Sequence, residues 1–166
     1  STMSVDRWVP SVRANPTAAP DLLFSYGSNH PAQLTERLGH PVVTGGAYLP
    51  GYRRIFRGMS KRWEGGVASL TKRAGAKAFG LVVHVTAADL TRMDVFEGIA
   101  SGNYKRKVVK VTLADGARRD AWVYVSLSET FHEPSRAYLE AVAKTVGTHW
   151  TEEGGRPVKW TDIDVP

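Results

Sequence analysis

The apolar run at residues 22–25 and the turn that follows it constrain this chain more than any other feature. The run has the composition of a short buried strand, residues 26–29 read Tyr-Gly-Ser-Asn, and Pro31 can open a helix. A small-residue turn between a strand and a helix can direct successive backbone N–H groups at an anion. The pattern therefore predicts an anion-binding turn, although in isolation the same four residues could merely start a helix.

Composition predicts one globular domain. The chain has 166 residues, 42% of them hydrophobic and 23% charged, which is enough for a core of ordinary size. We expect residues 1–20, with three prolines and little apolar periodicity, to form a disordered N-terminal extension, and residues 21–166 to form a single domain. No apolar run approaches the roughly 18 residues needed to span a bilayer, and no signal pattern opens the chain. We therefore expect a soluble, cytoplasmic protein with no membrane partner.

The charge is strongly basic but scattered. The formal net charge is +6 and the isoelectric point is near 9.7. Scattered cations favour solvated strand faces, and the same field could attract an anionic small substrate. A nucleic-acid groove is the sharper alternative, but it is not favoured because aromatic residues are not interleaved with the basic groups in a recognisable binding signature. The sequence leaves the oligomeric state open.

The order of apolar runs and turns predicts an α+β domain. After a strand at 22–26, Asn29 can cap a helix that Pro31 opens and Gly39 ends. Strand composition then dominates from 42 to 85, with turns expected at 50–51 and 65–66. The later elements are a helix at about 87–97 with a Thr86/Asp89 capping box, a hairpin of strands 104–113 and 119–127, and a helix from Pro134 through Val146. We predict a small, mostly antiparallel β-barrel with flanking helices.

Glu97 is the residue best suited to proton transfer. If Leu90 is set to zero on the helical wheel, Met93 falls at about 300° and Glu97 at about 340°, so the carboxylate lies within the apolar stripe. Partial desolvation and the negative end of the helix dipole would both raise its pKa toward neutrality. The alternative is a frayed last turn that releases Glu97 to solvent or to an arginine.

Other chemistries find little support in the residue pattern. There is no cysteine, which excludes disulfides, thiolate nucleophiles and cysteine-ligated zinc. The histidines have no metal-ligand spacing, and there is no Walker or Rossmann fingerprint, so we expect neither a metal nor a cofactor. Ser28 is not favoured as a nucleophile, because it lacks a Gly-x-Ser-x-Gly elbow and His30 is unsupported as its base.

Several short motifs together resemble the gamma-glutamyl cyclotransferase-like family. The resemblance extends from Leu22 to about Val146. It rests on the 26–29 turn, Trp-Glu-Gly-Gly at 63–66, Phe-Gly at 79–80, Asp-Val-Phe-Glu-Gly at 94–98, Gly-Asn-Tyr at 102–104, Ala-Trp-Val-Tyr-Val at 121–125 and Pro-Ser-Arg-Ala-Tyr-Leu at 134–139. It implies a small barrel with a substrate pocket at one end, and no metal or organic cofactor.

The resemblance also implies roles for individual residues. Glu97 would be the acid/base that cyclises a gamma-glutamyl group to 5-oxoproline, and Tyr138 is the tyrosine expected to touch the substrate. The residues expected to bind the small-molecule substrate are Leu23, Phe24, Ser25, Tyr26, Gly27, Ser28, Asn29, Tyr104, Tyr124 and Tyr138.

Two alternatives stay open. One is an enzyme of the same fold that cleaves a gamma-glutamyl amine or a gamma-glutamyl secondary metabolite. The other is a non-enzymatic module that binds a ligand or nucleic acid.

Overall fold

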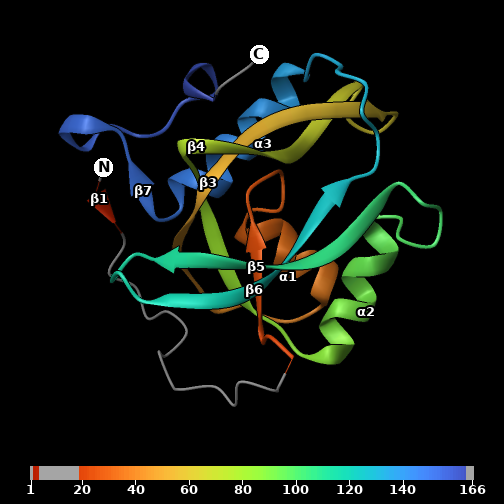
Figure 1. Cartoon of the computed structure of the whole chain (residues 1–166), viewed down its shortest axis with the longest axis horizontal. Helices are drawn as coiled ribbons and strands as arrows, with labels where there is room; N and C mark the ends of the chain where they lie inside the picture. The colour runs from red at the N-terminus through yellow and green to blue at the C-terminus, as the bar shows by residue number, and fades with distance from the viewer. Residues whose placement is uncertain (1, 4–18, 164–166) are drawn as a thin grey trace.

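The computed structural model describes residues 19–163 and the backbone of residues 2–3. Residues 1, 4–18 and 164–166 lie outside the described residues. The expectation that residues 1–20 are disordered falls largely on that part and stays a prediction. The backbone of strand β1 (Thr2–Met3) pairs antiparallel with β7 (Trp150–Thr151) at the edge of the molecule (Figure 1).

Five strands form a closed barrel (Figure 1). They are β2 (Leu22–Ser25), β3 (Thr44–Ser60), β4 (Gly65–His84), β5 (Tyr104–Leu113) and β6 (Arg118–Ser126). Their order around the barrel is β2-β4-β3-β5-β6, and every pairing is antiparallel except that of β2 with β6, where Leu23 opposes Trp122. The prediction of a small, mostly antiparallel barrel with flanking helices is confirmed.

The two longest strands differ from the sequence prediction. A turn was expected at residues 50–51, but Pro50 and Gly51 lie inside β3, where the register against β4 shifts between Pro50 and Tyr52. Proline has no N–H for the ladder, and Gly51 has a φ of 78°, so the pairing with β4 is interrupted here and the strand continues beyond it. The expected turn at residues 65–66 is also wrong, because these glycines begin β4.

Side chains alternate between the barrel interior and the layer beneath the helices. On β2, Leu22 and Phe24 belong to the interior cluster, whereas Leu23 packs with Leu34 and Met93 outside the barrel. All four residues of β2 are buried on both sides. This short strand therefore joins the two hydrophobic clusters.

Helices α1 (Pro31–Leu38) and α2 (Ala87–Phe96) pack against each other and cover that outer cluster. The N-cap of α1 is His30, whose Nδ1 accepts from the Gln33 backbone N–H, so the expectation that Asn29 caps this helix is wrong. Asn29 instead directs its amide into the cavity described below. The predicted stop at Gly39 is confirmed, with φ at 79°. The capping box of Thr86 and Asp89 is also present.

Helix α3 (Arg136–Gly147) and the segment after it cover another part of the barrel. Ser135 caps α3, so the helix begins two residues after the predicted Pro134, and its inner stripe of Leu139, Val142 and Val146 is buried. After β7 come two short 3₁₀ turns, η1 (Glu153–Gly155) and η2 (Trp160–Asp162).

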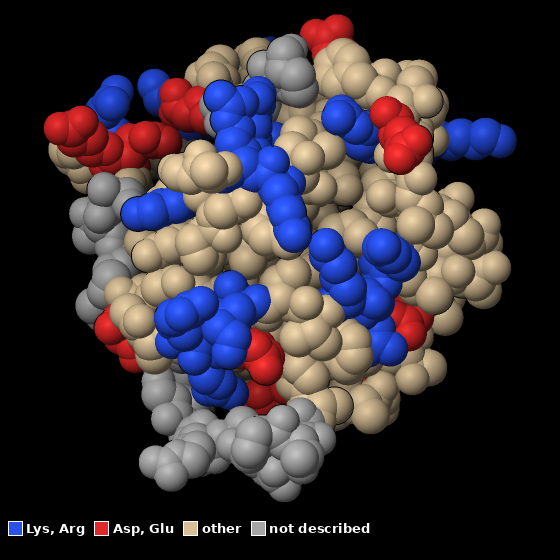
Figure 2. All heavy atoms as spheres, viewed as in Figure 1, with Lys and Arg blue, Asp and Glu red and all other residues tan. Residues whose placement is uncertain are grey.

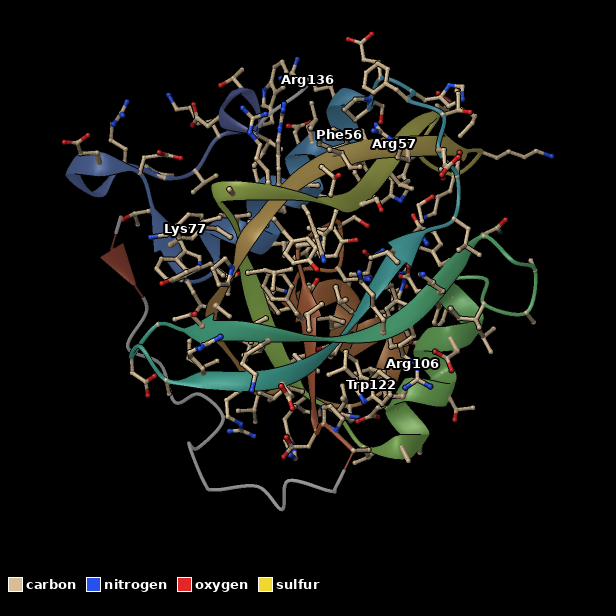
Figure 3. The ribbon with its side chains drawn as sticks, in the orientation of Figure 1. Phe56, Arg57, Lys77, Arg106, Trp122 and Arg136 are labelled. Atoms are coloured by element: carbon tan, nitrogen blue, oxygen red, sulfur yellow. The ribbon has the colours of Figure 1, made fainter. Side chains whose placement is uncertain are left out.

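On the face shown in Figure 2, basic side chains lie in separate groups, some of them with acidic side chains beside them. Several are engaged locally. Arg106 stacks 4.3 Å from the ring centre of Trp122 (Figure 3) and pairs with Asp94 at 3.1 Å. Among the described residues, no helix has the length and hydropathy to cross a membrane.

Substitution of Gly80 tests how closely β2 and β4 approach each other. A Cβ at this position would collide with the Ser25 carbonyl oxygen, which is backbone and can yield only if β2 moves. We expect Gly80→Ala to lower the free energy of unfolding by about 2–3 kcal/mol, as measured by urea denaturation. Gly147→Ala is the control, because its Cβ meets Val158 at an ordinary 3.6 Å and a helical alanine is favoured by up to about 1 kcal/mol. Equal effects of the two substitutions would contradict the close approach.

Candidate active site

A cavity of about 800 Å³ opens at one end of the barrel. Its wall includes the end of β2 and the loop after it, the end of α2, the β3–β4 turn and Tyr138 of α3. All the residues predicted from the sequence lie on this wall: residues 23–29, Glu97, Tyr104, Tyr124 and Tyr138. The structure therefore brings together residues that are up to 115 positions apart in the chain.

The loop at 26–29 presents backbone N–H groups that have no acceptor among the described residues. The Ser25 hydroxyl donates to the Asn29 carbonyl at 2.8 Å and so closes the loop. Among the described residues, no acceptor is bonded to the N–H groups of Gly27, Ser28 or Asn29. A Cβ at Gly27 would lie 3.1 Å from the Tyr138 hydroxyl, so the glycine leaves open the space between the loop and this phenol. Unpaired N–H groups beside a helix start favour a carboxylate.

Glu97 points into this cavity from the C-terminal end of α2. It is the C-cap residue, its N–H donates to the Met93 carbonyl, and its side chain is only 14% exposed. Both alternatives drawn from the sequence are partly realised, because the carboxylate faces inward and also meets an arginine. That arginine is Arg37, whose Nη1 lies 3.7 Å from Glu97 Oε2.

Asn29 connects these two charged groups. Its Nδ2 donates to Glu97 Oε2 at 3.1 Å, and its Oδ1 accepts from Arg37 Nη1 at 2.7 Å. Arg37 is buried, and its guanidinium also lies 4.9 Å from the ring centre of Phe96. Sequence reasoning missed Arg37. The available signal was its position beside Leu34 and Leu38 on the inner stripe of α1, where an unpaired cation would be costly.

The pKa of Glu97 is set by opposing effects. Burial raises the pKa of this carboxyl above its ordinary value, while the hydrogen bond from Asn29 and the charge of Arg37 lower it in part. Burial also lowers the pKa of Arg37, and Glu97 counteracts that effect. The net result is a carboxylate that binds a proton more readily than a solvated one, as a general base at neutral pH requires.

The predicted tyrosines differ in what their hydroxyls do. The Tyr138 hydroxyl accepts from the Ala68 N–H at 2.6 Å and stays close to the loop at Gly27. The Tyr124 hydroxyl donates to Asp94 Oδ1 at 2.6 Å, so this phenol is held by α2 even though its side chain lines the cavity. The two residues therefore offer different groups to a ligand.

Tyr104 and Tyr26 complete the aromatic wall. The Tyr26 hydroxyl donates to the Tyr124 carbonyl, whereas the Tyr104 hydroxyl bonds to none of the described residues. Burial raises the pKa of the Tyr26, Tyr104 and Tyr138 hydroxyls well above the usual range, and the charge of Glu97 raises each further. All three therefore stay protonated at neutral pH.

Ser28 and the histidines have no catalytic arrangement here. The His30 ring accepts the Gln33 N–H as a helix cap. Within the described residues, no group of histidine and acidic side chains is arranged to hold a metal ion.

Comparison with known families gives a direct match. The sequence profile described as "Gamma-glutamyl cyclotransferase, AIG2-like" matches residues 23–144, well over half of the chain. This chain belongs to the gamma-glutamyl cyclotransferase, AIG2-like family. The matched segment contains every candidate residue of the cavity from Leu23 to Tyr138.

Individual members of the gamma-glutamyl cyclotransferase, AIG2-like family agree with this assignment. Gamma-glutamylcyclotransferase of Mus musculus is 30% identical over 129 residues, which cover 73% of this chain and 67% of the mouse protein. Gamma-glutamylcyclotransferase of Homo sapiens is 27% identical over 150 residues, covering 85% and 75% of the two chains. A solved structure named gamma-glutamyl cyclotransferase superposes with a TM-score of 0.70 at 24% identity, over 75% of this chain and 77% of that one. This last likeness shows the shared fold.

The raised pKa of Glu97 predicts a pH-dependent change in stability for Glu97→Gln. The folded protein binds this proton more tightly than the unfolded chain does. The ionised carboxyl therefore costs stability above its unfolded pKa of about 4.3, and the cost disappears below it. Glutamine keeps the shape without the charge. We expect the variant to melt at a higher temperature than wild type near neutral pH, with the difference shrinking toward about pH 3.5, in calorimetric scans. A difference that does not change with pH would contradict the raised pKa.

Proposed function

We propose that this protein is a cofactor-independent gamma-glutamyl cyclotransferase that converts the gamma-glutamyl group of an amino acid or amide conjugate to 5-oxoproline and releases the amine. The observation that carries the proposal is the buried Glu97 carboxylate facing a loop of unpaired N–H groups in one cavity. An amino acid end has the complementary charges, because its carboxylate suits the N–H groups and its ammonium suits Glu97.

The chemistry follows from this placement. Glu97 takes a proton from the substrate's α-ammonium, and the free amine attacks the gamma-carbonyl carbon of the same molecule to form a new C–N bond. The bond from that carbon to the departing nitrogen then breaks as Glu97 returns the proton to this nitrogen, and the second proton that the ring nitrogen loses passes to the released amine. The products are 5-oxoproline and an amine, and the carboxylate is regenerated.

The enzyme contributes mainly orientation and charge stabilisation. Because attack is intramolecular, holding the substrate in a folded conformation removes much of the entropic barrier. The oxyanion that forms on the gamma-carbonyl needs a hydrogen-bond donor. The Tyr104 phenol is the candidate, because it stays protonated and bonds to none of the described residues.

A panel of gamma-glutamyl compounds, with 5-oxoproline detected by mass spectrometry, tests the proposal. The panel should include gamma-glutamyl amino acids, gamma-glutamyl amines and glutathione. Release of 5-oxoproline in step with the free amine is the expected result. A folded protein that binds these compounds without turning any of them over would support a ligand-binding module instead.

Substitution of Glu97 should abolish proton transfer while preserving the fold. Glu97→Gln cannot accept the ammonium proton, so we expect kcat to fall by roughly 100-fold to 10,000-fold, with a much smaller rise in KM from the lost charge on the substrate ammonium. Wild-type activity should be lost as pH falls through the pKa of Glu97, at a pH above that of an ordinary glutamate. Glu140→Gln is the control, since this half-exposed acid lies on α3, outside the cavity wall, and pairs with Arg136. Wild-type turnover by Glu97→Gln would remove this residue from the mechanism.

Substrate binding at the 26–29 loop should depend on the backbone more than on the Ser28 hydroxyl. Gly27→Val places methyl groups against the Tyr138 hydroxyl, which lies 3.1 Å from the Cβ position, and should raise KM by at least about 100-fold. Ser28→Ala removes one hydroxyl and should cost only about 0.5–1.5 kcal/mol of binding. Steady-state kinetics of both variants on the best substrate make the comparison. Loss of turnover in Ser28→Ala with intact binding would instead indicate a serine nucleophile.

A further inference from the structure

The mouth of the cavity carries more cations than the proposed reaction uses. The charged side chains on the described wall are Arg37, Lys61, Arg62 and Glu97. Arg37 is already paired with Glu97 and Asn29. Lys61 and Arg62 lie on the β3–β4 turn at residues 61–64, are exposed, and form no salt bridge with any of the described acidic residues. The mouth therefore has a surplus of positive charge.

Arg62 is held in place beside the substrate loop. Its guanidinium lies 5.5 Å from the ring centre of Trp63. The Gln33 side chain lies between the two elements. With its amide oriented so that both ends are satisfied, its nitrogen donates to the Ser28 carbonyl at 2.8 Å and its oxygen accepts from Arg62 Nη2 at 3.0 Å. A guanidinium fixed in this way, with its remaining N–H groups exposed, is suited to a carboxylate.

The same mouth is also apolar. Met59, Phe96 and Leu127 are 60%, 50% and 48% exposed, and all three line this cavity. Large side chains clustered at a cavity rim indicate a ligand that covers them. A gamma-glutamyl group held at the loop and Glu97 fills only the inner end of a cavity of about 800 Å³, so the outer part is available to the group that departs.

We propose that the mouth is a leaving-group subsite, and that it selects amines carrying both a free carboxylate and a bulky apolar side chain. The inference rests on the proposed cyclotransferase function. Arg62 binds the carboxylate of the departing amino acid, while Met59 and Leu127 cover its side chain. The preferred substrates are then gamma-glutamyl conjugates of large apolar amino acids, and the uncharged gamma-glutamyl amines are poorer.

Four substrates separate the two contributions: gamma-glutamylphenylalanine, gamma-glutamylalanine and the C-terminal amide of each. All four keep the same gamma-glutamyl end. For the wild-type protein we expect kcat/KM to fall by about 10-fold from either acid to its amide, and by about 10-fold from the phenylalanine compound to the alanine compound.

Two variants assign these preferences to residues. Arg62→Met should lower kcat/KM about 10-fold on the two acids and leave the two amides unchanged. The double variant Met59→Ser/Leu127→Ser should lower it about 10-fold on the phenylalanine compounds and leave the alanine compounds unchanged. The matched controls are Arg73→Met and Val43→Ser, which change an exposed cation and an exposed apolar side chain outside the cavity wall.

The outcomes are distinguishable. Equal loss on acids and amides in Arg62→Met would overturn the subsite, because Arg62 would then act on the gamma-glutamyl end or on the fold. Acids and amides used equally well by the wild type would overturn it too, with the cyclotransferase function intact. Absence of 5-oxoproline from all four substrates would remove the proposed function and this inference with it.

Discussion

Closure of the barrel by β2 is the constraint on which the rest of the structure depends. This strand is only four residues long, yet it pairs antiparallel with β4 on one side and parallel with β6 on the other. Its side chains belong to both hydrophobic clusters, inside the barrel and beneath the helices. Because β2 ends at Ser25, the chain leaves the barrel at a fixed point and turns at residues 26–29 toward α1. The cavity lies at the end of the barrel where β2 stops, and the pairing of β2 on both sides fixes the start of the loop.

Burial of charge is the second constraint on the site. A carboxylate and a guanidinium share a largely desolvated space, with the Asn29 amide bonded to both. Such pairs contribute little to stability, because desolvation offsets most of their attraction. What they provide is a defined position and a shifted pKa for Glu97. The surrounding tyrosines remain neutral, so the cavity contains hydrogen-bonding groups without competing negative charge.

Local signals predicted much of the fold. The capping box at Thr86 and the stop at Gly39 could be predicted because helix caps depend only on neighbouring residues. The inward direction of Glu97 could be predicted because it follows from the positions of residues on one helix. Long-range pairing was not readable. Pro50 and Gly51 resemble a turn until β4 is known to run beside them. Arg37 lies on the inner stripe of α1, but the sequence does not show its partner Glu97, which is 60 residues away. Much of the candidate site came from family resemblance, because Tyr104 and Tyr138 have no individual pattern that marks them.

The hydrogen bond between Trp150 and Gly80 connects the C-terminal segment to the loop at 26–29 through a series of contacts. The indole Nε1 donates to the Gly80 carbonyl at 2.9 Å, and Gly80 is the residue whose missing side chain lets β4 lie against Ser25. Ser25 in turn holds the loop through Asn29. Three successive contacts therefore link β7, which lies beyond the family-matched segment, to the residues that face Glu97. Substitutions in this segment would therefore change the geometry of the cavity even if every residue of the cavity wall stayed the same.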